Sequence, residues 1–394
     1  MKIVFFCIPA HGHTNPTLGV VRELVSRGHQ VWYYSYNAFR EKIETAGAVF
    51  VSCDGFDAEL KLSRKDFARL GNDLAFSTRI LVDTTLALDD MVCNDIKKLQ
   101  PDCIVSDSMA LWGKAIALKL GIPFVSSTTT FAFNQHSAKV IKQSLGDLVK
   151  MLLSLPRISK QIKRLQSHGY PVKNILDIIG TDADTHTIVY TSPEFQPCSD
   201  TFSPKFAFVG PSVRQPTDNI KKTRDKLIYV SMGTVNNDMK HFYKTCISAF
   251  ADTDYQVIMS VGDIAYDQIR DCVPDNISVF PFADQIAVLQ QADVFISHCG
   301  MNSVSESLYF EVPLVMFPKT SEQKGVAGRV LQLGAGISPR KADVASIISS
   351  VNQIISDNSY KQNAKKISRT FKNCQGADGA ADKIISVCHD LTKE

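Results

Sequence analysis

The chain of 394 residues exceeds the size of one compact domain, because single cores stop growing near about 250 to 300 residues, so we expect two domains. Its 44% hydrophobic and 21% charged residues are typical of a globular protein and exclude a disordered or collagen-like chain. The 43 basic and 40 acidic residues leave a net charge of only +3, so no broad basic surface for nucleic acid is expected.

The ten cysteines are scattered, and no CxxC pair occurs. This pattern favours reduced thiols in the cytoplasm over a disulfide framework or a zinc site. The first apolar run, residues 3–8, is too short for a secretory signal. No stretch reaches the ~20 apolar residues of a membrane span. We therefore expect a cytoplasmic protein without stable membrane insertion.

The first half alternates short apolar runs with helical patterns, which is typical of βα units feeding a parallel sheet. Residues 18–27 carry apolar side chains at helical spacing and end at Gly28, which suits a C-cap. Residues 135–180 are predicted to be mainly helical, with an apolar stripe at Leu145, Leu148, Met151 and Leu152 that shapes a ligand pocket or simply packs in the core. The other predicted elements of this half are strands at 3–8, 31–36, 103–106, 124–127, 188–191 and 206–209, and a helix at 111–120.

The second half repeats this pattern after a polar stretch that contains proline and a run of basic residues at Lys221, Lys222, Arg224 and Lys226, which we interpret as a solvated interdomain linker. The final residues predict a helix that either crosses back to the first domain or packs on its own, second domain. Strands are predicted at 227–230, 256–259, 277–280, 294–296 and 314–317. We therefore predict an N-terminal domain at 1–212, a linker at 213–226, a C-terminal domain at 227–375 and a terminal helix at 376–394, with both domains doubly wound α/β layers.

A predicted strand, a tight glycine turn and a helix start surround His298 and Gly300. Backbone N–H groups and the positive dipole end at a helix start bind anions. Asn302 and Ser303 can add donors, and Glu306, one turn later, can accept from a ribose hydroxyl. Asn302 or Ser303 can equally be an ordinary N-cap, so the spacing alone leaves a phosphate site and a cap both open.

His13 follows the first predicted strand, at the edge where open α/β sheets bind ligands. Its near-neutral reference pKa suits a general base that takes a proton from a hydroxyl. Asp107 ends another strand of the same sheet and can orient the imidazole and stabilise its charged form. The alternatives are a histidine that bonds its own loop and an aspartate that caps the next helix.

Several motifs run in a fixed order along almost the whole chain. The first half contains His11-Gly12-His13-x-Asn15-Pro16, Pro101-Asp102 with Asp107 and Trp112, Leu120-Gly121-Ile122-Pro123, Thr191-Ser192-Pro193-Glu194 and Gly210-Pro211. The second half contains His298-x-Gly300-x-x-Ser303-x-x-Glu306, Val312-Pro313-Leu314 and Glu322-Gln323. Together they resemble the bacterial macrolide and natural-product glycosyltransferases, within family 1 of the GT-B UDP-glycosyltransferases.

The resemblance implies a GT-B fold, in which two Rossmann-like domains face each other across a cleft. It also implies that His13 is the catalytic base and Asp107 its partner carboxylate. The positions that match the family's donor contacts are Thr234 for the distal phosphate, Phe282 and Gln285 for the base and nucleoside, His298, Gly300, Asn302 and Ser303 for the diphosphate, Glu306 for the ribose, and Glu322 and Gln323 for the sugar.

Three positions depart from the family pattern. Phe282 stands where tryptophan is usual, which keeps a π-face for the base but a smaller one. Glu322 stands where aspartate is commoner, which lengthens a sugar contact by one methylene. Cys299 replaces a glycine beside the phosphate turn, which we expect the turn to tolerate with a negative φ at this residue.

The implied activity is inverting transfer of a hexose, glucose first, from a UDP-sugar to a hydroxyl of a small acceptor, with no metal and no further cofactor. The acceptor is a small apolar or aromatic natural product such as a flavonoid, phenol, macrolide or terpenoid. The sequence Asp182-Ala183-Asp184 resembles a DxD metal motif but precedes a strand, so we interpret it as a polar turn. Phe56, Phe67, Phe76, Phe131 and Phe133 suggest an aromatic cavity, although each can equally belong to the core.

Three other functions share this architecture: a nucleotide-sugar epimerase, a catalytically silent nucleotide-sugar binder and a lipid-directed transferase. The epimerase would not need a His13-Asp107 pair beside an acceptor pocket. A dinucleotide oxidoreductase is disfavoured because no GxGxxG follows the first strand.

Overall fold

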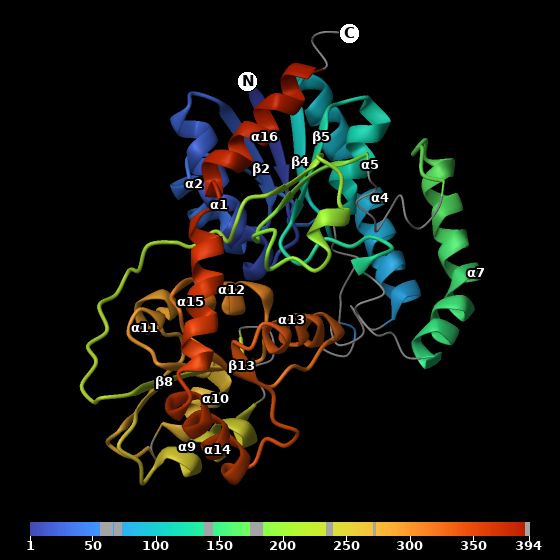
Figure 1. The fold of residues 1–394 in the computed structure, drawn as a ribbon. Helices are drawn as coiled ribbons and strands as arrows, with labels where there is room; N and C mark the ends of the chain where they lie inside the picture. The colour runs from blue at the N-terminus through green and yellow to red at the C-terminus, as the bar shows by residue number, and fades with distance from the viewer. Residues whose placement is uncertain are drawn as a thin grey trace. The chain divides into compact units, whose positions relative to one another are not determined.

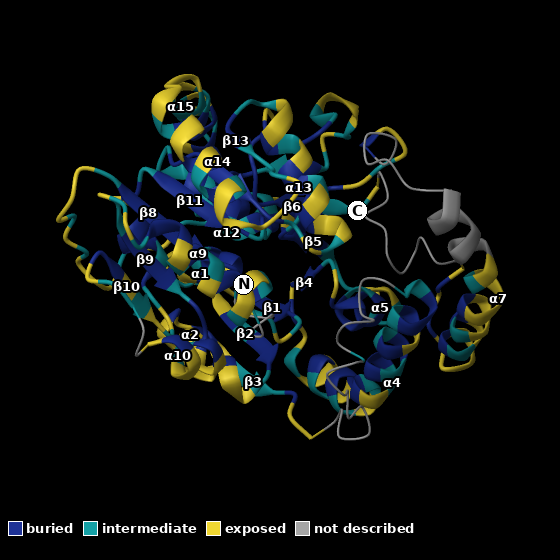
Figure 2. Ribbon diagram, turned by 90° about the horizontal axis from the view of Figure 1, so that it is seen from below, coloured by how far each residue is buried: buried dark blue, intermediate teal, exposed yellow. Residues whose placement is uncertain are grey.

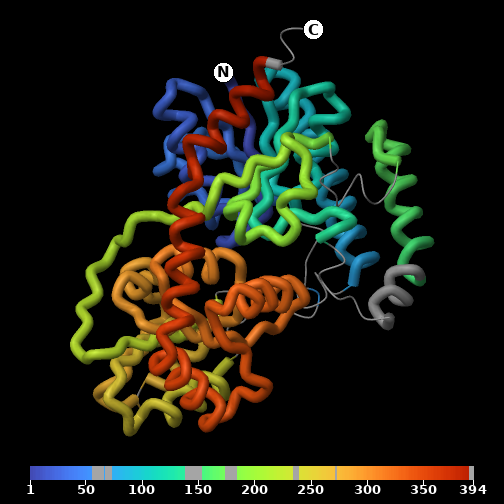
Figure 3. The backbone as a smooth tube through the Cα atoms, viewed as in Figure 1, coloured from blue at the N-terminus to red at the C-terminus, as the bar shows by residue number. Residues whose placement is uncertain are grey.

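The chain folds into two α/β units, each built on one parallel sheet (Figure 1). The computed structural model describes residues 1–55, 66, 73–137, 145–173, 184–233, 239–270 and 273–390. One unit is Met1–Ser212 together with Cys374–Glu394, and the other is Val213–Asn373. Figure 3 traces the C-terminal segment, in red, as it joins the unit that begins the chain.

The sheet of the first unit has seven parallel strands in the order β3-β2-β1-β4-β5-β6-β7. The order reverses between β1 and β4, and open sheets of this kind bind ligands beyond the carboxyl ends of the strands at such a reversal. The strands are β1 (Lys2–Phe6), β2 (Gln30–Ser35), β3 (Val49–Ser52), β4 (Cys103–Asp107), β5 (Phe124–Thr128), β6 (His186–Val189) and β7 (Phe206–Phe208).

Helices cover both faces of this sheet because side chains alternate along each strand. Ile3 and Phe5 of β1 pack with α1, α2 and α16, whereas Val4 and Phe6 pack with α4, α5 and α7. Figure 2 shows that the strands are largely buried and that exposed residues gather on the outer sides of the helices. The helices are α1 (His11–Ser26), α2 (Arg40–Thr45), α4 (Leu74–Leu99), α5 (Leu111–Leu120), α7 (Leu145–Ser167) and α16 (Gly376–Asp390), with 3₁₀ turns η1 (Asn37–Phe39) and η2 (Ser199–Thr201).

Helix α16 is part of the first unit's core. Ala380, Ala381 and Ile384 are fully buried in the same cluster as the side chains of α1. The Gly376 amide donates to the Val209 carbonyl at 2.8 Å, where the helix begins. At the surface, Arg27 of α1 pairs with two carboxylates of α16, Asp378 at 3.0 Å and Asp382 at 2.5 Å.

The sheet of the second unit has six parallel strands in the order β10-β9-β8-β11-β12-β13, with its reversal between β8 and β11. The strands are β8 (Leu227–Ser231), β9 (Gln256–Ser260), β10 (Ile277–Phe280), β11 (Val294–Ser297), β12 (Leu314–Met316) and β13 (Gly336–Ile337). The helices are α9 (Lys240–Phe250), α10 (Asp263–Ile269), α11 (Gln285–Leu289), α12 (Met301–Tyr309), α13 (Ser321–Gln332), α14 (Val344–Ser356) and α15 (Ser359–Lys372).

The first helix begins earlier than the sequence predicts. Helix α1 starts at His11 instead of residue 18, so the first histidine motif lies inside it. Gly12 and Pro16 look like helix breakers, but the amides of His13 and Thr14 both donate to the Ala10 carbonyl and start the helix there. Strands β3 and β13 and helices α2 and α4 were not predicted, and the strands that were predicted agree to within two residues at each end.

The remaining expectations about element type concern helix α7 and membrane spans. Helix α7 forms within the predicted helical region, but the side chains of its expected apolar stripe, Leu145, Leu148, Met151 and Leu152, lie outside the described ones. Every helix in the described ranges falls short of the apolar length that crossing a bilayer requires.

Candidate active site

His13 and Asp107 meet at the carboxyl edge of the first sheet. His13 is the third residue of α1, directly beyond β1, and Asp107 is the last residue of β4. His13 Nδ1 lies 2.7 Å from Asp107 Oδ2. The Asp107 side chain is fully buried, whereas 20% of the His13 side chain is exposed. The strand reversal between β1 and β4 therefore brings together the two residues that the sequence placed at this edge.

The hydrogen bonds around Asp107 define which imidazole nitrogen can act as a base. A carboxylate that accepts the Nδ1 proton leaves the lone pair of the neutral ring on Nε2. Thr129 Oγ1, just past β5, lies 3.1 Å from the same Nδ1. Asp107 Oδ1 accepts from the Met109 amide at 2.7 Å, and the N-cap of α5 is Ala110, so Asp107 is not that helix's cap.

Sequence reasoning did not select Thr129. The signal was present, because residues 126–130 are a run of serines and threonines that ends a predicted strand at the same edge of the sheet. Nothing in that run showed which hydroxyl would reach the imidazole.

A buried thiol, that of Cys7, contacts the residue that follows His13. Cys7 Sγ is 3.7 Å from Thr14 Oγ1. Burial raises the pKa of the Cys7 thiol well above its usual value, and the negative charge of Asp107 raises it further. Cys7 therefore stays protonated, which leaves His13 as the basic group at this edge.

The aromatic residues expected to line an acceptor cavity divide into core and surface. Phe76 and Phe131 are buried, so they belong to the core. Phe133 is 47% exposed, and Met109, two residues past Asp107, is also exposed. Phe56 and Phe67 lie outside the described residues.

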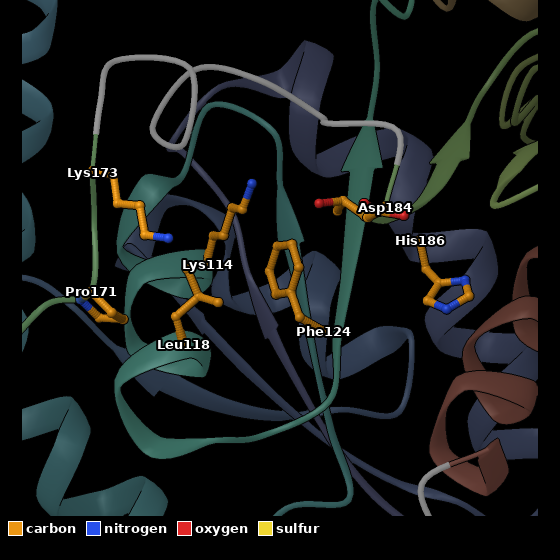
Figure 4. Close-up of a pocket in the computed structure, with 8 residues that line it drawn as sticks. Lys114, Leu118, Phe124, Pro171, Lys173, Asp184 and His186 are labelled. Carbon is orange, nitrogen blue, oxygen red and sulfur yellow. The ribbon is translucent and has the colours of Figure 1, made fainter. Parts of the chain in front are cut away.

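A shallow pocket of about 360 Å³ opens at the other edge of the same sheet (Figure 4). Phe124 and His186, the first residues of β5 and β6, line it together with Lys114 and Lys173. Because His13 and Asp107 lie at the carboxyl ends of strands, this pocket is separate from the candidate active site.

In the second unit, helix α12 begins with a bare N-terminus. Gly300 is the N-cap, and no side chain caps the helix. Asn302 and Ser303 are its second and third residues, so the alternative that one of them is the N-cap is wrong. The first-turn amides and the positive end of the helix dipole form the kind of anion site that the turn predicts.

Cys299 contradicts the expectation of a negative φ. Its φ is +69°, in the left-handed region that glycine favours. The side chain is completely buried, and the backbone amide donates to Ser297 Oγ at 3.1 Å. The turn therefore keeps the conformation of a glycine although the residue is a cysteine, at a cost of roughly 1–2 kcal/mol.

His298 is held between two glycines. An added Cβ would lie 2.5 Å from His298 Cε1 at Gly233 and 2.8 Å from Nε2 at Gly300. Burial lowers the pKa of His298 to about 4, so the ring is neutral at physiological pH. Its Nδ1 is buried and makes no well-formed hydrogen bond in the described part of the chain, although contact with the Ser231 backbone opposes part of the fall in pKa. A buried neutral imidazole beside an anion site can donate one N–H to a bound phosphate.

Gln285 and Glu306 form a second polar cluster at this edge. Gln285 Nε2 donates to Glu306 Oε2 at 2.5 Å and lies 3.5 Å from Ser303 Oγ, while Tyr229 lies 3.4 Å from Gln285 Oε1. Burial raises the pKa of Glu306 to about 7, although Gln285 and Arg214 oppose that shift. Phe282, just before α11, is 59% exposed and presents a ring to solvent.

The two residues matched to the sugar contacts behave differently. Glu322 lies exposed in the first turn of α13. Gln323 is buried and forms a capping box with Thr320, with its Oε1 accepting from the amides of Lys319 at 2.8 Å and Thr320 at 3.2 Å. The Gln323 side-chain carbonyl is therefore used to cap helix α13, and only its side-chain N–H groups can donate to a ligand. Thr234 lies outside the described residues.

Metal ligands are the last group of candidates. Among the described residues, no three or more His, Cys, Asp and Glu side chains gather as a metal site would require. Asp184 lies in a turn and pairs with Lys205 at 3.3 Å, and Asp182 is outside the described ranges.

Comparison with known proteins assigns this architecture to a family. A family model described as the C-terminal domain of erythromycin biosynthesis protein CIII-like proteins matches residues 244–377. The chain is 31% identical to the uncharacterized UDP-glucosyltransferase YojK of Bacillus subtilis, over 100% of this chain and 98% of that protein. It is 34% identical to the NDP-glycosyltransferase YjiC of Bacillus licheniformis, over 97% of this chain and 96% of that protein.

A solved structure agrees with this result. The crystal structure of the calicheamicin glycosyltransferase CalG4 matches with a TM-score of 0.80 and 27% identity, covering 98% of each chain. The two Rossmann-like units and these likenesses show that the chain is a glycosyltransferase with the GT-B fold and belongs to the bacterial natural-product branch of family 1.

Proposed function

We propose that the protein transfers a hexose, glucose first, from a UDP-sugar to a hydroxyl of a small apolar or aromatic natural product, with inversion at the anomeric carbon. The observation that carries this proposal is the 2.7 Å contact between His13 and buried Asp107 at the strand reversal. The name UDP-glucosyltransferase of a relative at 31% identity supports UDP and glucose as the first donor to test. None of the relatives named above is an epimerase, so that alternative has no support.

In this mechanism His13 Nε2 removes the hydroxyl proton of the acceptor as the oxygen bonds to the anomeric carbon. The bond from that carbon to the diphosphate oxygen breaks on the opposite face, and UDP leaves with the electron pair. Asp107 stabilises the imidazolium that forms. The amides at the start of α12 and the His298 N–H stabilise the charge that develops on the diphosphate.

The acceptor class is proposed from the surface near the base. Met109 and Phe133 expose apolar side chains on the segments that follow Asp107 and Thr129. These surfaces suit an apolar or aromatic acceptor better than a highly charged one. We further propose that the reaction takes place in the cytoplasm, because the nine cysteines of the described ranges are all free thiols.

The test is transfer by the purified full chain with several UDP-sugars and a panel of phenolic and macrolide acceptors, read by mass spectrometry. A product heavier by one anhydrohexose supports the proposal, and NMR of its anomeric centre reports inversion. His13→Ala should lower the rate by about 10²–10⁴-fold, because it removes the general base. It should leave UDP affinity near normal, because the proposed diphosphate contacts lie in the other unit.

His11→Ala is the matched control. His11 is two residues away on the same helix, but its ring packs on Phe39 with centroids 5.0 Å apart. Transfer should survive this change. Equal loss in both variants, or normal transfer by His13→Ala, would contradict the assigned base.

A further inference from the structure

The segment expected to be a solvated interdomain linker is anchored to a buried carboxylate of the second unit. Asp284 has a side chain that is only 1% exposed, and both terminal NH2 groups of the Arg214 guanidinium donate to its carboxylate. Thr217 donates to it through its amide at 2.5 Å and its hydroxyl at 2.8 Å, and the Asp218 amide adds a bond at 3.1 Å. Burial would raise the pKa of Asp284, but these donors outweigh burial and hold the pKa well below its usual value.

The same carboxylate starts the helix that carries Gln285. Asp284 is the N-cap of α11 and accepts from the amides of Ile286 and Ala287. Gln285 is the first residue of that helix, and its Nε2 donates to Glu306 Oε2 at 2.5 Å. Hydrogen bonds therefore connect Arg214 to Asp284 and Gln285 to Glu306, and the two pairs are joined by the peptide bond between Asp284 and Gln285.

Arg214 also acts on Glu306 through its charge. Its side chain is 44% exposed, and its positive charge favours the ionised form of Glu306, whereas Asp284 disfavours it. From β8 the phenol of Tyr229 interacts electrostatically with Glu306. On α15, Lys361 and Lys372 interact with Glu311 instead.

We propose that Arg214 is a positioning residue of the donor site, which fixes the start of α11 through Asp284 and directs its charge at Glu306 so that this side chain accepts hydrogen bonds from a ribose. This inference rests on the proposed function, because it assigns Glu306 to the ribose of a nucleotide-sugar. It makes the segment around Arg214 part of the binding site, although residue spacing suggested only a tether.

The test is titration of the full chain with UDP-glucose by calorimetry at several pH values. Wild-type affinity should rise as pH increases through about 7, because ionised Glu306 is the better acceptor. Arg214→Gln should weaken binding at pH 7 by about tenfold, or ~1.4 kcal/mol, and move the midpoint to higher pH. Arg214→Lys keeps the charge, so its midpoint should match that of the wild type. A purely structural role would weaken binding equally at every pH.

Arg224→Ala is the matched control, because Arg224 lies in the same segment and donates to the Thr253 carbonyl at 3.1 Å, away from Asp284. If Arg214→Gln does not fold, the double variant Arg214→Gln with Asp284→Asn replaces it. Because both charges are removed together, no buried charge is left without a partner. The affinity of the double variant should still fall, because the start of α11 loses its anchor, whereas the opposite effects of the two charges on Glu306 partly cancel in the midpoint. If Arg214→Gln, or the double variant where that one does not fold, binds UDP-glucose with the affinity and pH midpoint of the wild type, this inference is overturned while the proposed function stands. Failure of the wild type to bind UDP-glucose would overturn it together with the proposed function.

Discussion

Replacing Cys299 by glycine and by alanine should reverse the usual order of stability of these two residues. With φ at +69°, a residue with a Cβ is strained by roughly 1–2 kcal/mol, and only glycine relieves that strain. Glycine is more flexible than alanine in the unfolded chain, which lowers the free energy of unfolding of the glycine variant by roughly 0.5–1 kcal/mol. Cys299→Gly should therefore be more stable than Cys299→Ala by a few tenths to about 1 kcal/mol.

Urea unfolding followed by far-UV circular dichroism measures this difference. Tryptophan fluorescence is the wrong probe, because Trp32 and Trp112 both lie in the first unit. Cys246 gives the matched control, because it is also fully buried but lies in the middle of helix α9. There alanine should be the more stable replacement by about 1 kcal/mol, as is usual inside a helix.

The decisive quantity is the difference in stability between the glycine and alanine variants at Cys299, compared with the same difference at Cys246. If alanine is the more stable replacement at both cysteines, the turn before α12 does not strain its residue and the reasoning fails. A reversal at Cys299 alone shows that the backbone of this turn is built for glycine.

Three further changes test the site and the core. Gly300→Ala should weaken UDP binding at least about tenfold in a calorimetric titration, because the new Cβ would lie 2.8 Å from His298 Nε2; unchanged affinity would contradict the role of this ring. Between the usual pKa of glutamate and about 7, Glu306 is protonated in the folded state but ionised in the unfolded chain. The free energy of unfolding should therefore fall by up to ~3 kcal/mol as pH rises through that window, and Glu306→Gln should remove this pH dependence in urea titrations. Burial opposes ionisation of Asp89, but hydrogen bonds led by that of Lys119 outweigh it and lower its pKa, so its contribution to stability is present at neutral pH and is lost as pH falls through the lowered pKa. Asp89→Asn should therefore cost ~1–3 kcal/mol at pH 7, and the cost should shrink as the urea titrations are taken to pH values below the usual aspartate pKa.

The position of the first site could be predicted because it depends on topology. His13 and Asp107 each follow a buried strand, and parallel strands end at one edge, so their proximity followed from the order of elements. Thr129 was missed because the choice among neighbouring hydroxyls depends on side-chain direction. That direction is set by tertiary packing, which spacing does not reveal.

Backbone conformation and local hydrogen bonds account for most other differences. The φ of Cys299 is imposed by the turn between β11 and α12, against the preference of the residue itself. Gln323 spends its carbonyl on a helix cap, a use that a matched motif does not reveal. The anchoring of Arg214 depends on Asp284, 70 residues away, so a polar segment looked like a tether.

The position of α16 has a consequence for how the protein is made. Domains generally fold in the order in which the ribosome delivers them, with the N-terminal one first. Here one helical layer of the first unit is incomplete until Ala380, Ala381 and Ile384 have been synthesised, whereas all of Val213–Asn373 precedes them. The unit that is translated first is therefore the last to be completed, and a nascent chain that stops before residue 376 leaves part of an apolar sheet face open to chaperones and proteases.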